Sequence, residues 1–328
     1  MSTGSLLNAQ YYNAVQVNQL FRPSVSFGSD WIGPQAHKSD GFQGFEETYQ
    51  HRIYGSAIIP IKGKLGLDID LNPINLLRPK ELLKVRVYQL FANIHLARHK
   101  TAWRFPNDEQ ESLFELGAGL SMIRYKGKKK LAFYSLNLLV AESFNDLEDS
   151  RIRGTFLWGN AYIKNLKRQF FYGALFSYTH RLNYPIPFAG AIFKLNKKNS
   201  LSIILPVQIA WTHKFSRKWK QSLFIGISAF SSGYGNTDIL ALNSQDKIVQ
   251  QYWNLRIGTK VKIRLDKKWS ILINGGYASE SRLSFSGPNE ESQSLRLEGA
   301  PFVGITVFHS FHKSLVRNIL DRLNIDWD

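Results

Sequence analysis

The clearest pattern in the sequence is a strict alternation of apolar with small or polar residues between Leu113 and Ala141. In the first half, the even positions Phe114, Leu116, Ala118, Leu120 and Met122 alternate with Glu115, Gly117, Gly119 and Ser121. Basic residues at 126–130 interrupt the alternation, which then resumes. A two-residue period predicts strands with one apolar face. The stretch is therefore interpreted as a long hairpin.

The other face of this hairpin is mostly Gly, Ser and Asn, which carry too little bulk for an ordinary protein core. This favours an apolar face in contact with lipid. The sequence contains no apolar run of about 18 residues, so no transmembrane helix is predicted. Because only helices and closed barrels satisfy all backbone polar groups in a bilayer, the sequence predicts an all-β, antiparallel transmembrane β-barrel.

The predicted connections alternate in length. Short basic turns occur at 126–130, 165–168, 214–218 and 265–268, and long polar loops at 143–150, 183–199, 233–250 and 282–294. Outer-membrane barrels combine short periplasmic turns with long external loops. Counting back from the last strand gives about 12 strands, within a range of about 10–14. A soluble lipocalin-like or sandwich fold is the alternative, but strands near the ~9–11 residues needed to span a bilayer favour the membrane barrel.

The chain is expected to contain one barrel domain, residues 11–311, between two short terminal segments. Residues 1–10 resemble the end of a signal peptide or a disordered terminus. Residues 312–328 are predicted to form a short amphipathic periplasmic helix that binds a partner or packs on the barrel. Its apolar positions have helical spacing: Leu315, Ile319, Leu320 and Leu323.

The formal net charge of +17, from 42 Lys and Arg against 25 Asp and Glu, is large. One interpretation is solvated turns that favour solubility. The alternatives are an anion-attracting lumen, or contact with acidic lipid head groups, phosphate or partners. Nucleic acid is not expected as a partner, because the cations lie mainly at strand ends. The absence of Cys and of metal-ligand spacing predicts no metal site and no cofactor.

One predicted strand carries a ladder of cations that alternate with aliphatic residues. Facing Lys or Arg towards lipid near the midplane costs about 2–4 kcal/mol, so the cations are predicted to face the lumen. The lumen-facing candidates on this strand are Arg256, Lys260 and Lys262, and those on an earlier strand are Lys64, Asp68 and Asp70. Both an anion-selective lumen and an internal ion-pair network are consistent with these residues.

A segment with two prolines, Tyr184 to Gly190, is not expected to form a central strand. It is interpreted as an external loop, either exposed or folded inward to narrow the pore. The pore-loop candidates are Tyr184, Pro185, Pro187 and Phe188.

The eight histidines are mostly isolated at strand ends, and no G-x-S-x-G motif occurs. Pairs such as His180 with Ser177 are too common to predict catalytic residues. The sequence favours a non-enzymatic channel or an accessory subunit of an envelope complex. The alternative is a lipid-modifying hydrolase, such as a phospholipase or a lipid A deacylase-like enzyme, with an outward-facing Ser–His pair.

Three short segments carry a resemblance to a known group of proteins: Gly299 to Phe308, Ala9-Gln10, and Tyr184 to Gly190. They resemble Bacteroidetes-type outer-membrane β-barrel proteins of a largely uncharacterised family. The resemblance implies the outer membrane of a Gram-negative bacterium and contact with its lipid, and is compatible with a periplasmic or outer-membrane protein partner. It implies location and fold rather than an activity.

Overall fold

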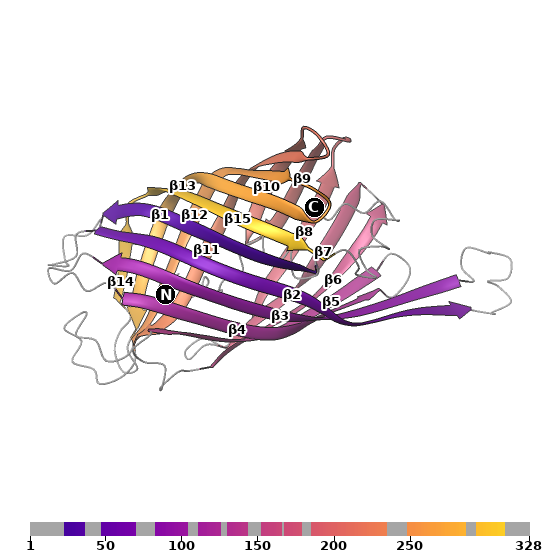
Figure 1. The fold of residues 1–328 in the computed structure, drawn as a ribbon, viewed down its shortest axis with the longest axis horizontal. Helices are drawn as coiled ribbons and strands as arrows, with labels where there is room; N and C mark the ends of the chain where they lie inside the picture. Colours follow the sequence, from indigo (N-terminus) through magenta and orange to yellow (C-terminus); the bar gives the residue numbers. More distant parts are fainter. Residues whose placement is uncertain are drawn as a thin grey trace.

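The computed structural model describes residues 23–36, 47–69, 83–103, 111–125, 130–143, 152–165, 167–178, 185–234, 248–286 and 293–311. All regular structure in these ranges is β-strand (Figure 1). The strands are β1 (Ser24–Ala36), β2 (Glu47–Ile69), β3 (Leu83–Trp103), β4 (Glu111–Tyr125), β5 (Lys130–Ser143), β6 (Arg153–Asn165), β7 (Arg168–Tyr178), β8 (Pro185–Lys194), β9 (Asn199–Leu205), β10 (Gln208–Lys214), β11 (Trp219–Tyr234), β12 (Ile248–Arg264), β13 (Trp269–Ser286), β14 (Gln293–Leu297) and β15 (Ala300–Ser310). No helix in these ranges is long and apolar enough to cross a membrane.

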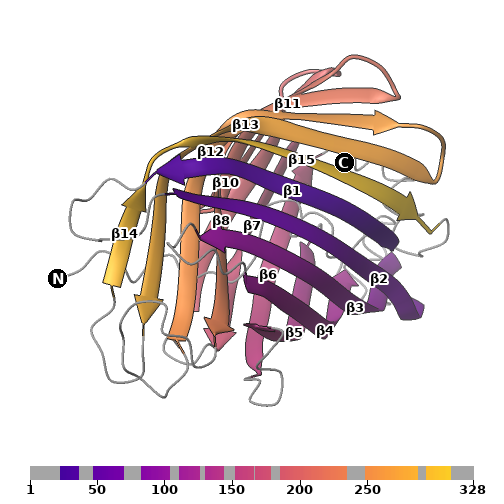
Figure 2. The ribbon, with the colours of Figure 1, turned by 60° about the vertical axis from the view of Figure 1, so that its left-hand side comes forward.

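The strands form one closed sheet. Neighbouring strands pair in sequence order from β1 to β13, and the ring closes because β15 pairs with both β13 and β1. The short strand β14 pairs with the far end of β13, so β14 and β15 together line one side of β13 (Figure 2). The described residues therefore form an antiparallel barrel of 14 strands.

The predicted number of about 12 strands was too low, because the region from residue 183 to 213 was assigned incorrectly. The predicted loop 183–199 contains β8, and the predicted strand 201–213 is the hairpin of β9 and β10. Its turn lies at Pro206–Val207, where a proline cannot continue a central strand. These two corrections account for the two additional strands.

The prolines of β8 are tolerated because of where β8 has neighbours. Pro185 and Pro187 pair with Phe176 and Ala174 of β7, whereas pairing with β9 begins only at Ala189. In the described residues this end of β8 has one strand beside it, so a missing backbone N–H breaks no ladder on the other side. The expectation of a loop at Pro185, Pro187 and Phe188 was therefore wrong, and Tyr184 lies outside the described residues.

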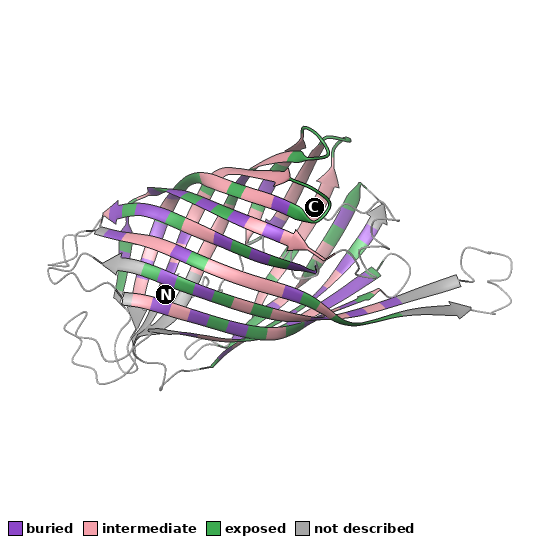
Figure 3. Ribbon diagram, in the orientation of Figure 1, coloured by how far each residue is buried: buried purple, intermediate pink, exposed green. Residues whose placement is uncertain are grey.

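Burial alternates residue by residue along the strands (Figure 3), and many large apolar side chains are exposed on the outer face. Leu116, Leu120, Leu136 and Leu138 are each 46–52% exposed, whereas Glu115, Ser121 and Ser135 on the opposite face are buried. This confirms the predicted alternation. An apolar exterior on a closed sheet is what a bilayer requires, so the chain forms an integral β-barrel of the outer-membrane type.

Three hairpin turns at one end of the barrel share a sequence pattern and a geometry. Each has an apolar residue, then Asn, Ser or Asp, then two cations: 195–198, 215–218 and 265–268. The polar side chain accepts two backbone N–H groups, as Asp266 does from Lys268 and Trp269, both at 2.6 Å. Asn196 and Ser216 accept the corresponding pairs. Such side-chain acceptors stabilise tight turns.

Two rows across the sheet repeat one arrangement of inward-facing residues. In the first, Phe133 of β5 pairs with Gly159 of β6, then Gly173 of β7, then Phe188 of β8. In the second, Phe224 of β11 pairs with Gly258 of β12, then Gly276 of β13, then Phe302 of β15. In each row, the two ring centroids lie 6.2 Å apart across the two glycine strands.

These glycine pairs mark places where the barrel wall curves sharply. A Cβ at Gly276 would lie 2.5 Å from the Cα of Gly258, and one at Gly173 would lie 2.7 Å from the Cα of Gly159. The inner faces of the two strands are therefore too close for any side chain. Glycine at such positions allows a barrel to turn a corner.

At the end of the barrel opposite the three turns, the strands extend to different levels. There, β5 and β11 pair in parallel at Gly233 and Glu142, although β6–β10 separate them in the sheet. The paired part of β6 ends at Arg153, and β9 and β10 have only 7 residues each. In the described residues, the pairing of β6 with β5 therefore stops at Leu139, before the level at which Glu142 of β5 meets β11.

Both terminal segments lie outside the described residues. These include residues 1–10 and the predicted helix 312–328 with Leu315, Ile319, Leu320 and Leu323.

Candidate functional site: a cationic bay in the lumen

The cation ladder of β12 points into the barrel. Ile257 is 52% exposed on the outer face, whereas Arg256 and Lys260 lie against the buried rings of Phe302 and Phe224. Lys262 follows on the same face, opposite Leu272 of β13. The structure thus places these three predicted residues on the inner face of one strand.

The candidates on the earlier strand, Lys64, Asp68 and Asp70, are not placed in the lumen by the described residues. A register shift between Pro60 and Lys62 inserts Ile61 and reverses the faces of β2, so that Lys64 is exposed opposite Tyr88 on the outward side of β3. Its expected lumen position is therefore corrected. For Asp68 the structure gives only its backbone pairing with Lys84, and Asp70 lies outside the described residues.

Arg256, Lys260, Phe224 and Phe302 form a cluster that we call the cationic bay. The Lys260 Nζ lies 4.1 Å from the Phe224 ring centroid, and the guanidinium carbon of Arg256 lies 5.0 Å from that of Phe302. The rings meet edge to face at 64°. Gly258 lies between the two cations on β12 and pairs with Phe224 of β11. A cation over an aromatic face is attracted by the ring quadrupole.

Neutral groups fix the two cations in position. Lys260 Nζ donates to Gln208 Oε1 at 2.9 Å, and Arg256 Nε donates to Asn254 Oδ1 at 3.1 Å. Asn254 in turn donates to the hydroxyl of Tyr252, which donates to Gln35 of β1. Asn254 and Gln35 are fully buried. The guanidinium of Arg256 is therefore held by a chain of buried polar groups that links β12 to β1.

Among the described residues, neither Arg256 nor Lys260 lies within ion-pair distance of a carboxylate. The nearest opposite charge that acts on Lys260 is Asp30 of β1, which lies in the same row of the sheet beyond Asn274 and Gly304. Both cations are part-buried, and two cations on one strand repel each other. A small anion entering the lumen would add negative charge within contact distance of both cations. The bay therefore has the chemistry of an anion site.

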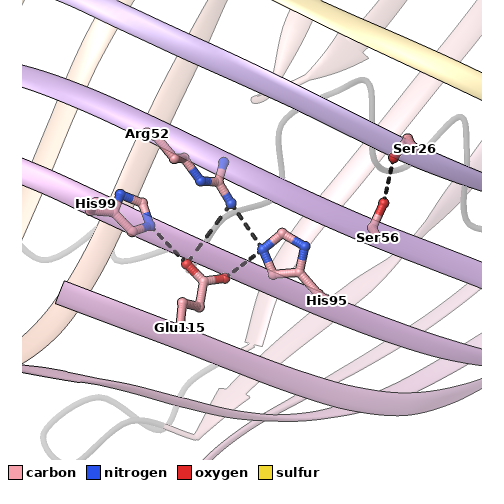
Figure 4. Close-up of polar contacts among 6 residues, drawn as sticks. All are labelled: Ser26, Arg52, Ser56, His95, His99 and Glu115. Atoms are coloured by element: carbon pink, nitrogen blue, oxygen red, sulfur yellow. Dashed lines mark hydrogen bonds and ion pairs between the residues drawn. The ribbon is translucent and has the colours of Figure 1, made fainter. Parts of the chain in front are cut away.

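Charge is compensated elsewhere in the lumen, where four residues form what we call the Glu115 cluster (Figure 4). The Glu115 carboxylate lies 2.9 Å from His95 Nε2, 3.0 Å from His99 Nε2 and 3.9 Å from Arg52. Glu115 is only 3% exposed. The two interpretations of the lumen charges thus apply to different places: an ion-pair network on β2–β4, and cations on β12 that no described carboxylate contacts directly.

A third region of the lumen is apolar. Its buried residues include Phe91, Phe133, Leu157 and Leu175, and Phe188 packs against them from β8. This lining covers the inner faces of β2–β8, on the side of the barrel away from the bay. Phe188 therefore does line the lumen, but from a strand rather than from a loop.

One Ser–His contact lies on the outer face. Ser29 Oγ is 2.9 Å from His51 Nε2, on neighbouring strands β1 and β2. In the part of the chain that the structure describes, no carboxylate or amide contacts His51 as a third member. Ser177 is buried on β7, and His180 lies outside the described residues. No described group of three or more His, Cys, Asp or Glu is arranged to hold a metal ion.

Sequence reasoning missed the aromatic and neutral partners of the bay. Phe224 and Phe302 lie far apart in the chain, and only the strand register shows that Gly258 and Gly276 separate them. One local signal was available: glycine alternates with the cations Arg256 and Lys260 at inward positions of β12.

Comparison with protein families gives one match. The family model described as "Domain of unknown function (DUF6268)" matches residues 108–291, more than half of the chain. The chain belongs to this family. The match runs from β4 into the region after β13, and contains the cation ladder and both glycine pairs. The DUF6268 match gives no support to the Bacteroidetes origin suggested by the resemblance. A search among functionally curated proteins finds no match.

Solved structures with similar architecture are outer-membrane proteins. The Pseudomonas putida toluene transporter TodX is 8% identical over 93% of this chain and 99% of its own, with a TM-score of 0.38. The translocator domain of the autotransporter NalP from Neisseria meningitidis is 8% identical over 91% and 93%, with a TM-score of 0.35. A Pseudomonas aeruginosa FadL homologue is 10% identical over 95% and 96%, at 0.33. These scores are low, and the barrel of this DUF6268 protein is established by its own strand pairing.

Proposed function

We propose that this DUF6268 protein is an outer-membrane channel that admits small anions through the cationic bay. The observation that carries the proposal is the pair Arg256 and Lys260, which face the lumen with no described carboxylate within ion-pair distance. Cations that line a pore concentrate anions in it and repel cations. No described residue has a role that requires chemistry on the solute, so the proposed activity is conduction.

The Glu115 cluster supports the same proposal by contrast. Its carboxylate neutralises the nearby guanidinium of Arg52, so this cluster adds little net field to the lumen. Selectivity is therefore expected to depend on β12 rather than on the total charge of the chain. The hydrolase alternative is weaker, since the Ser29–His51 pair has no described third group to orient the histidine.

The test is ion selectivity in planar bilayers. Purified wild-type protein under a KCl gradient should give a reversal potential that indicates preferred chloride passage. The double variant R256Q/K260Q keeps polar, hydrogen-bonding side chains and removes both charges, so the preference for chloride should fall to near unity. Its conductance should also depend less on anion type, because the binding site for the anion is lost.

The matched control is K267Q/K268Q, which removes the same charge from an exposed turn outside the lumen. This variant should retain the wild-type selectivity, because exposed charges are screened over ~10 Å at 0.1 M salt. Equal selectivity of R256Q/K260Q and wild type would contradict the proposal. Absence of conductance in folded wild-type protein would contradict it as well, and would favour an accessory subunit of an envelope complex.

A further inference from the structure

The hairpin of β2 and β3 extends far beyond the barrel wall at the end with the short turns (Figure 1). These two strands have 23 and 21 residues. The pairing of β2 with β1 ends at Ile58, and that of β3 with β4 ends at Val87. We call residues 59–69 of β2 with their partners, residues 83–92 of β3, the arm. At its base, residues 87–92 of β3 still pair with β4, and residues 83–86 extend beyond it.

A bulge at the base of the arm sets its direction. The register of β2 with β3 shifts between Pro60 and Lys62, and Gln89 Nε2 donates to the Lys62 carbonyl at 3.2 Å. Gln89 is 3% exposed, and a Cβ at Gly63 would lie only 2.7 Å from its Oε1. Bulges bend a strand and increase its twist. The buried Gln89 thus fixes the point at which the ribbon leaves the wall.

At this same point the arm passes beyond the apolar outer surface of the barrel. Ile61 is 56% exposed on the outside, and the next residues, Lys62 to Lys64, are exposed and basic or glycine. The end of a barrel with short turns is the periplasmic end. The arm therefore projects into the periplasm rather than along the membrane.

The β2 edge of the arm has no neighbouring strand among the described residues. Among the described residues, β2 from Ile59 to Ile69 pairs with β3 only. A two-stranded ribbon alone is at best marginally stable in water. An unpaired strand edge presents a row of backbone donors and acceptors, on which another chain can add a strand.

The positive charge of the arm limits which kind of strand can pair with its β2 edge. Residues 59–69 contain Lys62 and Lys64 against the single acid Asp68, and the paired strand contributes Lys84 and Arg86 to the sequence of the arm. Two copies of such an arm would repel each other, whereas a strand with acidic side chains would be attracted. We propose that the arm binds an acidic β-strand of a periplasmic protein along this edge of β2. This inference does not depend on whether the lumen conducts.

The experiment measures binding of a labelled peptide to the full-length protein in detergent. The probe is a nine-residue strand-forming peptide of alternating sequence, Thr-Glu-Val-Glu-Thr-Glu-Val-Glu-Thr, with fluorescein at its N-terminus. One control peptide has Lys in place of every Glu. A second has Pro in place of both Val residues, which keeps the charge and prevents strand pairing.

The acidic peptide should bind saturably by fluorescence anisotropy, and the lysine peptide should not. The proline peptide should bind at least about tenfold more weakly, because prolines block the backbone ladder. The protein variant K62E/K64E should lose at least about tenfold in affinity, because it places like charges opposite the peptide. The variant K267E/K268E, which reverses the same charge on a turn at the same end, should bind as wild type does.

Equal binding of the acidic and proline peptides would show attraction by charge alone and would overturn the proposal. Equal affinity of K62E/K64E and wild type would do the same. Vesicles of phosphatidylglycerol provide the remaining test. If the arm's lysines were required for binding vesicles but not for binding the peptide, the arm would be a lipid-contacting element instead. Retained heat-modifiable mobility on gels will show that each variant still forms the closed barrel.

Discussion

At the scale of single residues, glycine decides the shape of the lumen. The two rows of Phe, Gly, Gly and Phe have the same order of residue types but differ in their surroundings. The row at Gly159 and Gly173 is flanked by Leu157 and Leu175, which belong to the apolar lining. In the row at Gly258 and Gly276, the flanking positions on β12 hold Arg256 and Lys260 instead. One backbone arrangement therefore supports two different linings.

The first residue-scale prediction concerns Gly276→Ala. The added methyl would meet the Gly258 Cα at 2.5 Å, and backbone cannot move aside as a flexible side chain can. We expect a loss of about 1–3 kcal/mol in the free energy of unfolding, as for other overpacked sites. Unfolding in urea, followed by tryptophan fluorescence in detergent micelles, measures this loss.

The neighbouring Gly275→Ala is the matched control. A Cβ at Gly275 has its nearest contact at 3.5 Å, from the Phe302 carbonyl oxygen, which is an ordinary distance. Its stability should therefore stay close to that of wild type. Equal destabilisation by both substitutions would mean that glycine matters for chain flexibility rather than for close approach of β12 and β13.

At the scale of elements, the turns at 195–198, 215–218 and 265–268 show how local sequence sets register. The two backbone N–H groups bound by Asp266, from Lys268 and Trp269, hold the pKa of its carboxyl below its usual range. A carboxyl with a lowered pKa in the folded state stabilises the fold above its unfolded pKa, and this contribution is lost as the pH falls through the folded value.

We therefore expect Asp266→Ala to lower the urea midpoint of unfolding at pH 7. The difference from wild type should shrink as the pH is lowered towards 3, because the wild-type carboxylate is then progressively protonated. Asp266→Asn keeps one side-chain acceptor without the charge, so its urea midpoint should lie between those of wild type and Asp266→Ala. The difference between Asp266→Asn and Asp266→Ala should not vary with pH. A pH-independent difference between wild type and Asp266→Ala would show that the charge of Asp266 contributes nothing.

At the scale of the whole molecule, the contact of β5 with β11 is the least expected feature. It brings Glu142 and Gly233 together across the ends of five intervening strands. The ring of strands is therefore narrower at this end than at the end with the short turns. The barrel is held by this contact in addition to its closure between β1 and β15.

A disulfide tests this contact. Paired Cα atoms in a sheet lie within the ~4.4–6.8 Å that a disulfide spans, so E142C/G233C should oxidise readily. The natural chain has no cysteine, so no other disulfide competes. The pair E142C/S228C should stay reduced, because five residues along β11 displace the thiol by about 17 Å. Electrophoresis with and without reductant separates these outcomes, and equal oxidation of both pairs would contradict the contact.

Much of the fold could be predicted because alternation is a local property. The strands around Phe114 to Met122 and the ladder from Arg256 to Lys262 follow from the period of two alone. Predictions failed where the outcome depended on which strands lie beside a residue, because this is not visible in the local sequence. Two prolines exclude a strand with neighbours on both sides, but β8 has only one described neighbour at Pro185 and Pro187. The bulge at Ile61 similarly reversed the expected face of Lys64.

The sequence by itself determined that this chain forms strands with one apolar face, joined by short basic turns, and that Arg256 and Lys260 share a face of one strand. These are consequences of spacing along the chain. Only the tertiary structure decided that 14 strands close into a ring, that Glu115 compensates Arg52, and that Phe224 and Phe302 meet above Arg256 and Lys260. The reason is physical: charge compensation and ring contacts depend on register between strands, which the sequence of any one strand does not contain.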